Sequence, residues 1–104
     1  MVVLVTAVET IPRQNELIAQ LRHRVPNLVA IIHNINPQKT NVIMGNKTKS
    51  LWGSDTIIDK LGPFSFRISA RSFFQVNTKQ AEVLYNKAVE YAGLSGRETV
   101  IDAY

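Results

Sequence analysis

Cysteine is absent from this 104-residue sequence. Its absence excludes a disulfide, a thiolate zinc site and a thiol nucleophile within these residues. The two histidines, His23 and His33, have no acidic residue at ligand spacing beside them, and we expect both to lie on the surface or in loops. The sequence therefore predicts no metal site and excludes several classes of enzyme for these residues.

Long apolar runs are absent as well. None approaches the roughly 20 residues that a membrane-spanning helix needs, and residues 1–5 lack the basic flank of a secretion signal. The composition, 45% hydrophobic and 19% charged, is that of an ordinary globular domain. We expect a cytoplasmic protein that makes no contact with a membrane.

Acidic residues are missing from the middle of the chain, between Glu16 and Asp55. The cations in this interval are Arg22, Arg24, Lys39, Lys47 and Lys49. Such a block attracts the phosphate backbone of a nucleic acid, but dispersed cations are also a common solubility feature. With a net charge of +4, both interpretations stay open.

The first third of the sequence predicts a β-α-β unit. Residues 2–8 form a β-branched apolar run, typical of a strand covered on both faces, and we expect it to be central in its sheet. An amphipathic helix is expected from Pro12 to Val25, ended by Pro26. A second buried strand is expected over 28–32.

Short strands that pair antiparallel are expected after this unit. Turn-forming residues at 34–39 precede them, and the strands are predicted over 40–44, 49–53, 56–61 and 64–69. The last strand alternates apolar and polar residues, which indicates that one of its faces is buried.

The last third predicts one helix and one strand. The helix is expected from Asn77 or Thr78 to Ala92, ended by Gly93, and the strand over 99–104. We place a domain boundary after residue 72, because the β-rich character of the sequence changes there. The predicted fold class is α+β (α/β), with a mostly antiparallel sheet and flanking helices.

The stretch from Arg71 to Asn77 joins a strand to a helix and is the most informative part of the sequence. The carboxamide of Gln75 donates and accepts hydrogen bonds at once. It suits the zwitterionic end of a cofactor or the edge of a uracil, or else it only satisfies backbone groups at a helix start. Phe73 and Phe74 either stack on a base or pack in a core.

A series of motifs runs along the chain. They are Leu51-Trp52-Gly53, Ile57-Ile58-Asp59, Phe66-Arg67-Ile68-Ser69, Ser72-Phe73-Phe74-Gln75-Val76-Asn77 and Thr99-Val100-Ile101-Asp102-Ala103-Tyr104. In order and spacing they resemble the bacterial RNA (uracil-5-)-methyltransferases, of the type that methylates uridine at C5 in 23S rRNA. The resemblance implies a central α/β domain over 1–72, followed over 73–104 by the start of a Rossmann-like catalytic domain.

The resemblance also implies a cofactor, S-adenosylmethionine. Gln75 and Tyr104 are implied to contact it, with Phe73, Asn77 and Asp102 in support. Enzymes of this family use a cysteine thiolate that adds to C6 of uracil, and this chain has no cysteine. We therefore expect a fragment that is inactive alone and binds the cofactor weakly or not at all.

The expected partner is RNA, either rRNA or tRNA. An alternative is a stand-alone basic RNA-binding α+β module without catalysis, and a third possibility is an interaction domain related to the methyltransferases by descent only. If the chain is a fragment, its last helix and strand lack a sheet to cover them. We then expect self-association through the apolar side chains of Leu84, Tyr85, Val100 and Ile101.

Overall fold

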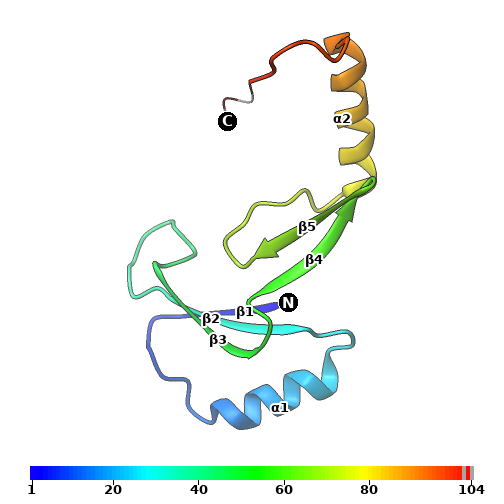
Figure 1. Ribbon diagram of the computed structural model, residues 1–104. Helices are drawn as coiled ribbons and strands as arrows, with labels where there is room; N and C mark the ends of the chain where they lie inside the picture. Colours follow the sequence, from blue (N-terminus) through cyan, green and yellow to red (C-terminus); the bar gives the residue numbers. More distant parts are fainter. Residues whose placement is uncertain (102, 104) are drawn as a thin grey trace. The chain divides into compact units, whose positions relative to one another are not determined.

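The computed structural model describes residues 1–101 and 103, and it contains both strands and helices (Figure 1). The chain divides into two compact units. The first holds Met1–Asp59 and Phe66–Phe74, and the second holds Lys60–Ser65 and the residues from Gln75 onward. The predicted α+β fold class is confirmed.

The predicted β-α-β start is present in the first unit. Strands β1 (Val2–Thr6) and β2 (Ala30–Ile35) pair in parallel, and helix α1 (Gln14–Arg24) connects them. The helix lies along one face of the three-stranded sheet (Figure 1). Its half-buried apolar positions are those that the helical spacing predicted: Leu17, Ile18 and Leu21.

The central strand is β2 and not β1, which corrects one expectation. The sheet has the order β1-β2-β3, and every residue of β2 is buried. In β1 the side chain of Val5 is 40% exposed. Strand β2 also extends past the predicted residues 28–32, through the polar residues His33, which was expected on the surface or in a loop, and Asn34, which was expected in a turn.

His33 is one of these polar residues, and the expectation that it lies on the surface or in a loop is wrong. Its side chain is fully buried, and its Nε2 lies 2.8 Å from the hydroxyl of Thr6. That hydroxyl donates its single proton to the carbonyl of Val8, so Nε2 must be the donor toward Thr6. His23 is exposed on α1, as expected, and no cluster of metal-binding residues occurs in the described part of the chain.

Strand β3 (Lys47–Gly53) pairs antiparallel with β2 and contains a β-bulge. Ile31 faces Trp52, but the next residue, Ile32, faces Ser50, so one residue of β3 has no partner. In a regular strand Trp52 and Ser50 would point to the same face of the sheet. The bulge directs Trp52 to the face covered by α1.

Trp52 packs against the helix on that face. The guanidinium of Arg22, in α1, lies 4.7 Å from the centre of the indole ring, within the range of a cation–π contact. The side chain of Trp52 is half-buried. Trp52 is therefore a packing residue between β3 and α1.

The loop between β2 and β3 is held by two asparagines, and the predicted strand over 40–44 is absent. Fully buried Asn34 accepts a hydrogen bond from the backbone N–H of Gly45 (2.7 Å) and donates to its carbonyl (2.9 Å). Asn36 donates to the carbonyls of Val42 and Ile43, at 2.7 and 3.0 Å. These carbonyls bond to side chains instead of a neighbouring strand, so no ladder forms.

Gly45 is the closest point of this loop to the sheet. A Cβ atom at this position would lie 2.0 Å from the carbonyl oxygen of Ile35 in β2. Only glycine allows such an approach without displacing the backbone. The loop geometry therefore depends on Gly45 as well as on the two asparagines.

Strands β4 (Thr56–Leu61) and β5 (Phe64–Ser69) form a two-stranded sheet, close to the predicted ranges. A two-residue connection at Gly62 and Pro63 joins them, and such a tight connection requires antiparallel strands. Figure 1 shows the two arrows running in opposite directions. The predicted hairpin is confirmed.

Helix α2 (Thr78–Ala92) lies in the second unit with the predicted ends. Asn77 caps it by accepting from the N–H of Gln80, and Gly93 ends it with φ of 57°. Ala81 is buried, but the other residues of its apolar stripe are exposed. No helix in the described part of the chain is both long and apolar enough to cross a membrane.

The predicted strand over 99–104 is not seen in the residues that the structure describes. Thr99, Val100, Ile101 and Ala103 have no regular secondary structure. A strand needs a partner for its backbone groups, and none of the described strands pairs with these residues. The carboxylate of Glu98 instead closes a tight turn by accepting from Ser95, which holds the pKa of Glu98 down at about 2.

Candidate functional site

The motif that carries the resemblance begins with a closed turn at the end of β5. The backbone N–H of Ser72 donates to the carbonyl of Ser69, and the two hydroxyls lie 2.9 Å apart. Arg71, inside this turn, donates from Nη1 to the carbonyl of Gly45 at 3.2 Å. The turn and the β2–β3 loop are therefore joined within the first unit.

The two phenylalanines of the motif differ in their surroundings. The ring of Phe74 is half-buried and lies 5.7 Å from the ring of Phe66 in β5, a tilted aromatic pair. The side chain of Phe73 is 85% exposed. The core interpretation is therefore right for Phe74 and wrong for Phe73, which is accessible for contact with another molecule.

Gln75 and Asn77 differ in their exposure and contacts. The side chain of Asn77 is the N-cap of α2, accepting from the N–H of Gln80 at 3.2 Å, so the predicted helix start at Asn77 is confirmed. Gln75 is half-buried and precedes the cap by two residues. The other two expected site residues, Tyr104 and Asp102, lie outside the described residues.

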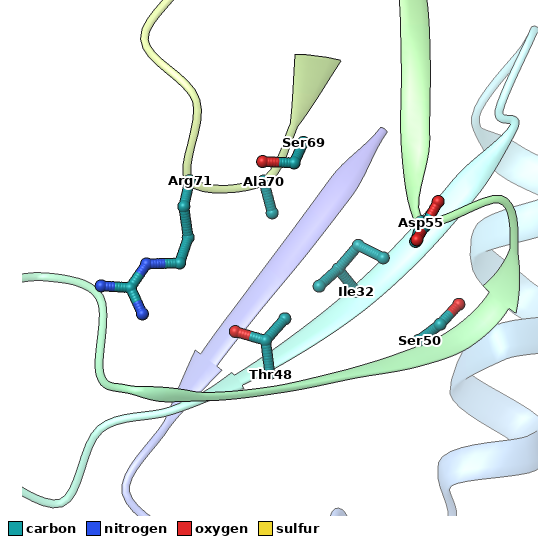
Figure 2. Close-up of a pocket in the computed structure, with 7 residues that line it drawn as sticks. All are labelled: Ile32, Thr48, Ser50, Asp55, Ser69, Ala70 and Arg71. Atoms are coloured by element: carbon teal, nitrogen blue, oxygen red, sulfur yellow. The ribbon is translucent and has the colours of Figure 1, made fainter. Parts of the chain in front are cut away.

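A cleft of about 430 Å³ lies in the first unit, beside the turn that contains Arg71 (Figure 2). It is lined by Ile32, Thr48, Ser50, Asp55, Ser69, Ala70 and Arg71. Figure 2 shows Ile32 between Arg71 on one side and Asp55 on the other. The cleft thus combines three hydroxyls and one charge of each sign around a nearly buried isoleucine.

The basic block in the sequence is partly neutralised in the fold. Lys47 and Lys49 both contact the carboxylate of Glu9, with N–O distances of 2.5 and 3.7 Å. These contacts hold the pKa of Glu9 below its ordinary value, mainly through the hydrogen bond from Lys47. An interval without acids in the sequence therefore does not produce a uniformly cationic surface.

No protein-family model matches the chain. Three curated proteins described as uncharacterized RNA methyltransferases match all 104 residues: those of Halalkalibacterium halodurans (52% identical), Listeria innocua (55%) and Clostridium tetani (54%). The predicted resemblance to RNA methyltransferases is confirmed. The chain spans 23% of the length of each of these relatives.

A solved structure agrees with these relatives. The tRNA (uracil-54, C5)-methyltransferase of Pyrococcus abyssi, in complex with S-adenosyl-L-homocysteine, superposes with a TM-score of 0.61 and 26% sequence identity. The match covers 85% of this chain and 20% of that one. The chain therefore has the fold of a segment of such an enzyme.

Sequence reasoning missed the cleft and the buried polar residues beside it. In the sequence, Asp55 only marked the end of the interval without acidic residues. Arg71 only marked the start of a motif. One usable signal was the pair of asparagines, Asn34 and Asn36, because an asparagine directly after a buried apolar run can satisfy the backbone of an adjoining loop. The β-bulge in β3 left no such signal.

Proposed function

We propose that this chain is part of an S-adenosylmethionine-dependent enzyme that methylates uridine at C5 in RNA, either rRNA or tRNA. The observation that carries the proposal is the match of all 104 residues to RNA methyltransferases at 52% to 55% identity. The uracil-C5 specificity rests on the structural neighbour, which is named as a uracil-C5 enzyme and is bound to the demethylated cofactor.

Gln75 is the residue of this chain that we assign to the cofactor. Its carboxamide is half-buried and so remains accessible, and it can donate to a carboxylate while accepting from an ammonium group. Both groups occur at the methionine end of S-adenosylmethionine, which supplies the methyl group when bound. Asn77 acts indirectly, because its cap fixes where α2 begins and hence where the backbone near Gln75 runs.

In the proposed domain organisation, residues 1–72 form a central domain and residues 73–104 form the opening segment of the catalytic domain. The 104 residues alone are proposed to be inactive. Uracil C5 becomes nucleophilic when a thiolate adds to C6, and the sequence contains no cysteine. One carboxamide also cannot hold a cofactor without further contacts, so its affinity for the isolated chain should be low.

Calorimetric titration with S-adenosylmethionine tests the assignment of Gln75. The proteins compared are the 104-residue chain and a longer protein in which these residues are followed by the catalytic region of the Listeria innocua relative. In the longer protein Gln75→Ala should weaken binding by about 1–3 kcal/mol, the cost of leaving charged groups unpaired. Gln80→Ala, an exposed position on α2, is the matched control.

Equal effects of the two glutamine variants would refute the cofactor role. Tight binding by the 104-residue chain alone would contradict the proposal that it holds only part of the pocket. Transfer of a labelled methyl group to C5 of uridine in rRNA or tRNA by the longer protein would support the proposed reaction. Transfer to another base, or to neither RNA, would contradict that part of the proposal.

Self-association of the isolated chain forms part of the same proposal. Leu84 and Tyr85 on α2 are 62% and 48% exposed, and Val100 and Ile101 are 67% and 82% exposed. Apolar surface of this kind favours association in water. Light scattering should show a dimer that Leu84→Ser weakens, whereas Val76→Ser, at a 99% exposed position outside the stripe, should not. A monomer at all concentrations would contradict it.

A further inference from the structure

The cleft beside Arg71 has the size and lining of a binding site that the cofactor assignment does not use. Its volume of about 430 Å³ lies in the usual range for ligand pockets, roughly 300–1,000 Å³. Thr48 and Ser50 line it because their partners in β2, Asn34 and Ile32, point to the same face of the sheet. The bulge next to Ser50 keeps the bulky Trp52 off this face.

Arg71 is held in position for an anion. Its guanidinium has five N–H donors, and the bond to the carbonyl of Gly45 uses one of them. That bond restricts the long side chain, so less rotamer entropy is lost when a ligand binds. A phosphate group matches the remaining donors, because guanidinium binds it with two parallel hydrogen bonds.

Asp55 lies on the other side of Ile32 and offers a carboxylate, where Arg71 offers a guanidinium (Figure 2). It forms no ion pair with any other residue in the described ranges 1–101 and 103. An ionised carboxylate only accepts hydrogen bonds, and its two oxygens accept two parallel N–H groups. A ligand that reaches Asp55 must therefore offer donors, and ideally two side by side.

Thr48 adds a directed donor between these charges. Its Oγ1 accepts a hydrogen bond of 3.0 Å from the fully buried Asn34, so its own proton is left for another acceptor. Ile32 lies at the bottom of the cleft and is only 2% exposed, so the contacts that a ligand can make come from the polar side chains around it.

We propose that this cleft binds a guanine nucleotide of single-stranded RNA, separate from the uridine that is methylated. The Watson–Crick edge of guanine carries N1–H and the N2 amino group side by side, which match the two oxygens of Asp55. Its O6 accepts from Thr48, and Arg71 binds the adjoining phosphate. Adenine, cytosine and uracil each lack this pair of adjacent donors. The inference rests on the proposed RNA substrate.

Fluorescence anisotropy with labelled RNA tetranucleotides tests the inference on the 104-residue chain. The RNAs differ at one position, which is guanine, adenine, cytosine or hypoxanthine, the last being guanine without the N2 amino group. The guanine RNA should bind about tenfold more tightly than the hypoxanthine RNA, as expected for one lost hydrogen bond to a charged group. This comparison leaves the protein unchanged, so folding cannot affect it.

Substitutions then test whether the preference for guanine arises in the cleft. Asp55→Asn should bring the guanine-to-hypoxanthine ratio close to one, although removing an anion raises the affinity for every RNA. Glu16→Gln, the same charge change at an exposed position on α1, should leave the ratio unchanged. Arg71→Gln should weaken all four RNAs more than Arg24→Gln does.

Three results would overturn the inference: no binding of any RNA at low salt, equal affinity for the guanine and hypoxanthine RNAs, or a preference that survives Asp55→Asn. None of them bears on the cofactor titration of Gln75 or on methyl transfer to uridine in the longer protein. Failure of the guanine site and failure of the proposed enzymatic function are therefore distinguishable.

Discussion

Replacing Asn34 by alanine should destabilise the first unit by about 2–4 kcal/mol. The side chain is fully buried, accepts one hydrogen bond from the N–H of Gly45, and shares the two protons of its amide nitrogen among three acceptors. At about 1 kcal/mol for each of these three protons the loss is about 3 kcal/mol, and the buried groups left without a partner raise it towards 4 kcal/mol. The lower bound applies if water reaches the half-exposed Gly45 and replaces some of these bonds.

Asn34→Asp separates hydrogen bonding from packing, because aspartate has nearly the same size. The amide nitrogen donates to the carbonyls of Gly45 and Lys47 and to the hydroxyl of Thr48, so a carboxylate oxygen there would face two carbonyl oxygens. It would also carry a buried charge without a partner. We expect the aspartate variant to be less stable at neutral pH than the alanine variant.

Urea unfolding followed by the fluorescence of Trp52, the only tryptophan, measures both changes in the first unit. Asn41→Ala, at an exposed position in the same loop, is the control and should change the stability by no more than about 0.5 kcal/mol. Equal urea midpoints for Asn34→Ala and Asn41→Ala would refute the role given to Asn34. The same conclusion would follow if the aspartate variant were as stable as the wild type.

Three further predictions follow from local geometry. Gly45→Ala places a Cβ atom 2.0 Å from a backbone oxygen of β2 and should lower the stability by at least about 2 kcal/mol in the same urea assay; an unchanged midpoint would show that the loop can move away. Nitrogen-15 NMR should find neutral His33 as the Nε2–H tautomer, since Nε2 donates to Thr6, and a proton on Nδ1 would contradict this. In a carboxyl titration Glu98 should have a pKa of about 2, below the ordinary 4.5, and Ser95→Ala should raise it. Because the folded pKa is the lower one, this contact should stabilise the turn above about pH 4.5 and be lost as the pH falls towards 2.

The elements that sequence reasoning placed correctly are those with signals of their own. Asn77 and Gly93 mark the two ends of α2, and each acts on the backbone beside it. Gly62 and Pro63 mark the β4–β5 hairpin in the same way. The spacing of apolar residues located α1 because one stripe of a helix must face the sheet.

The elements placed wrongly depend on contacts with distant residues. His33 and Asn34 are polar and suggest a turn, yet both are buried in β2, because Thr6 and the backbone around Gly45 bond to their side chains. The residues at 40–44 suit a strand, but no adjacent strand pairs with them. The carbonyls of Val42 and Ile43 instead accept hydrogen bonds from the side chain of Asn36. Strand propensity cannot decide such cases, because pairing stabilises a strand more than its own residues do.

The residues of the candidate site show the same difference between local signals and long-range contacts. Gln75 lies in a continuous motif, so a resemblance could name it without knowledge of the fold. Asp55 and Arg71 belong to different strand ends and line one cleft only because the sheet and the turn after β5 bring them there. The bulge in β3 is equally decisive: with regular alternation Trp52 would point to the cleft face, and its indole would compete for the space over Ile32. A single unpaired residue in β3 thus allows the helix side of the sheet to hold the tryptophan and leaves the other side open to a ligand.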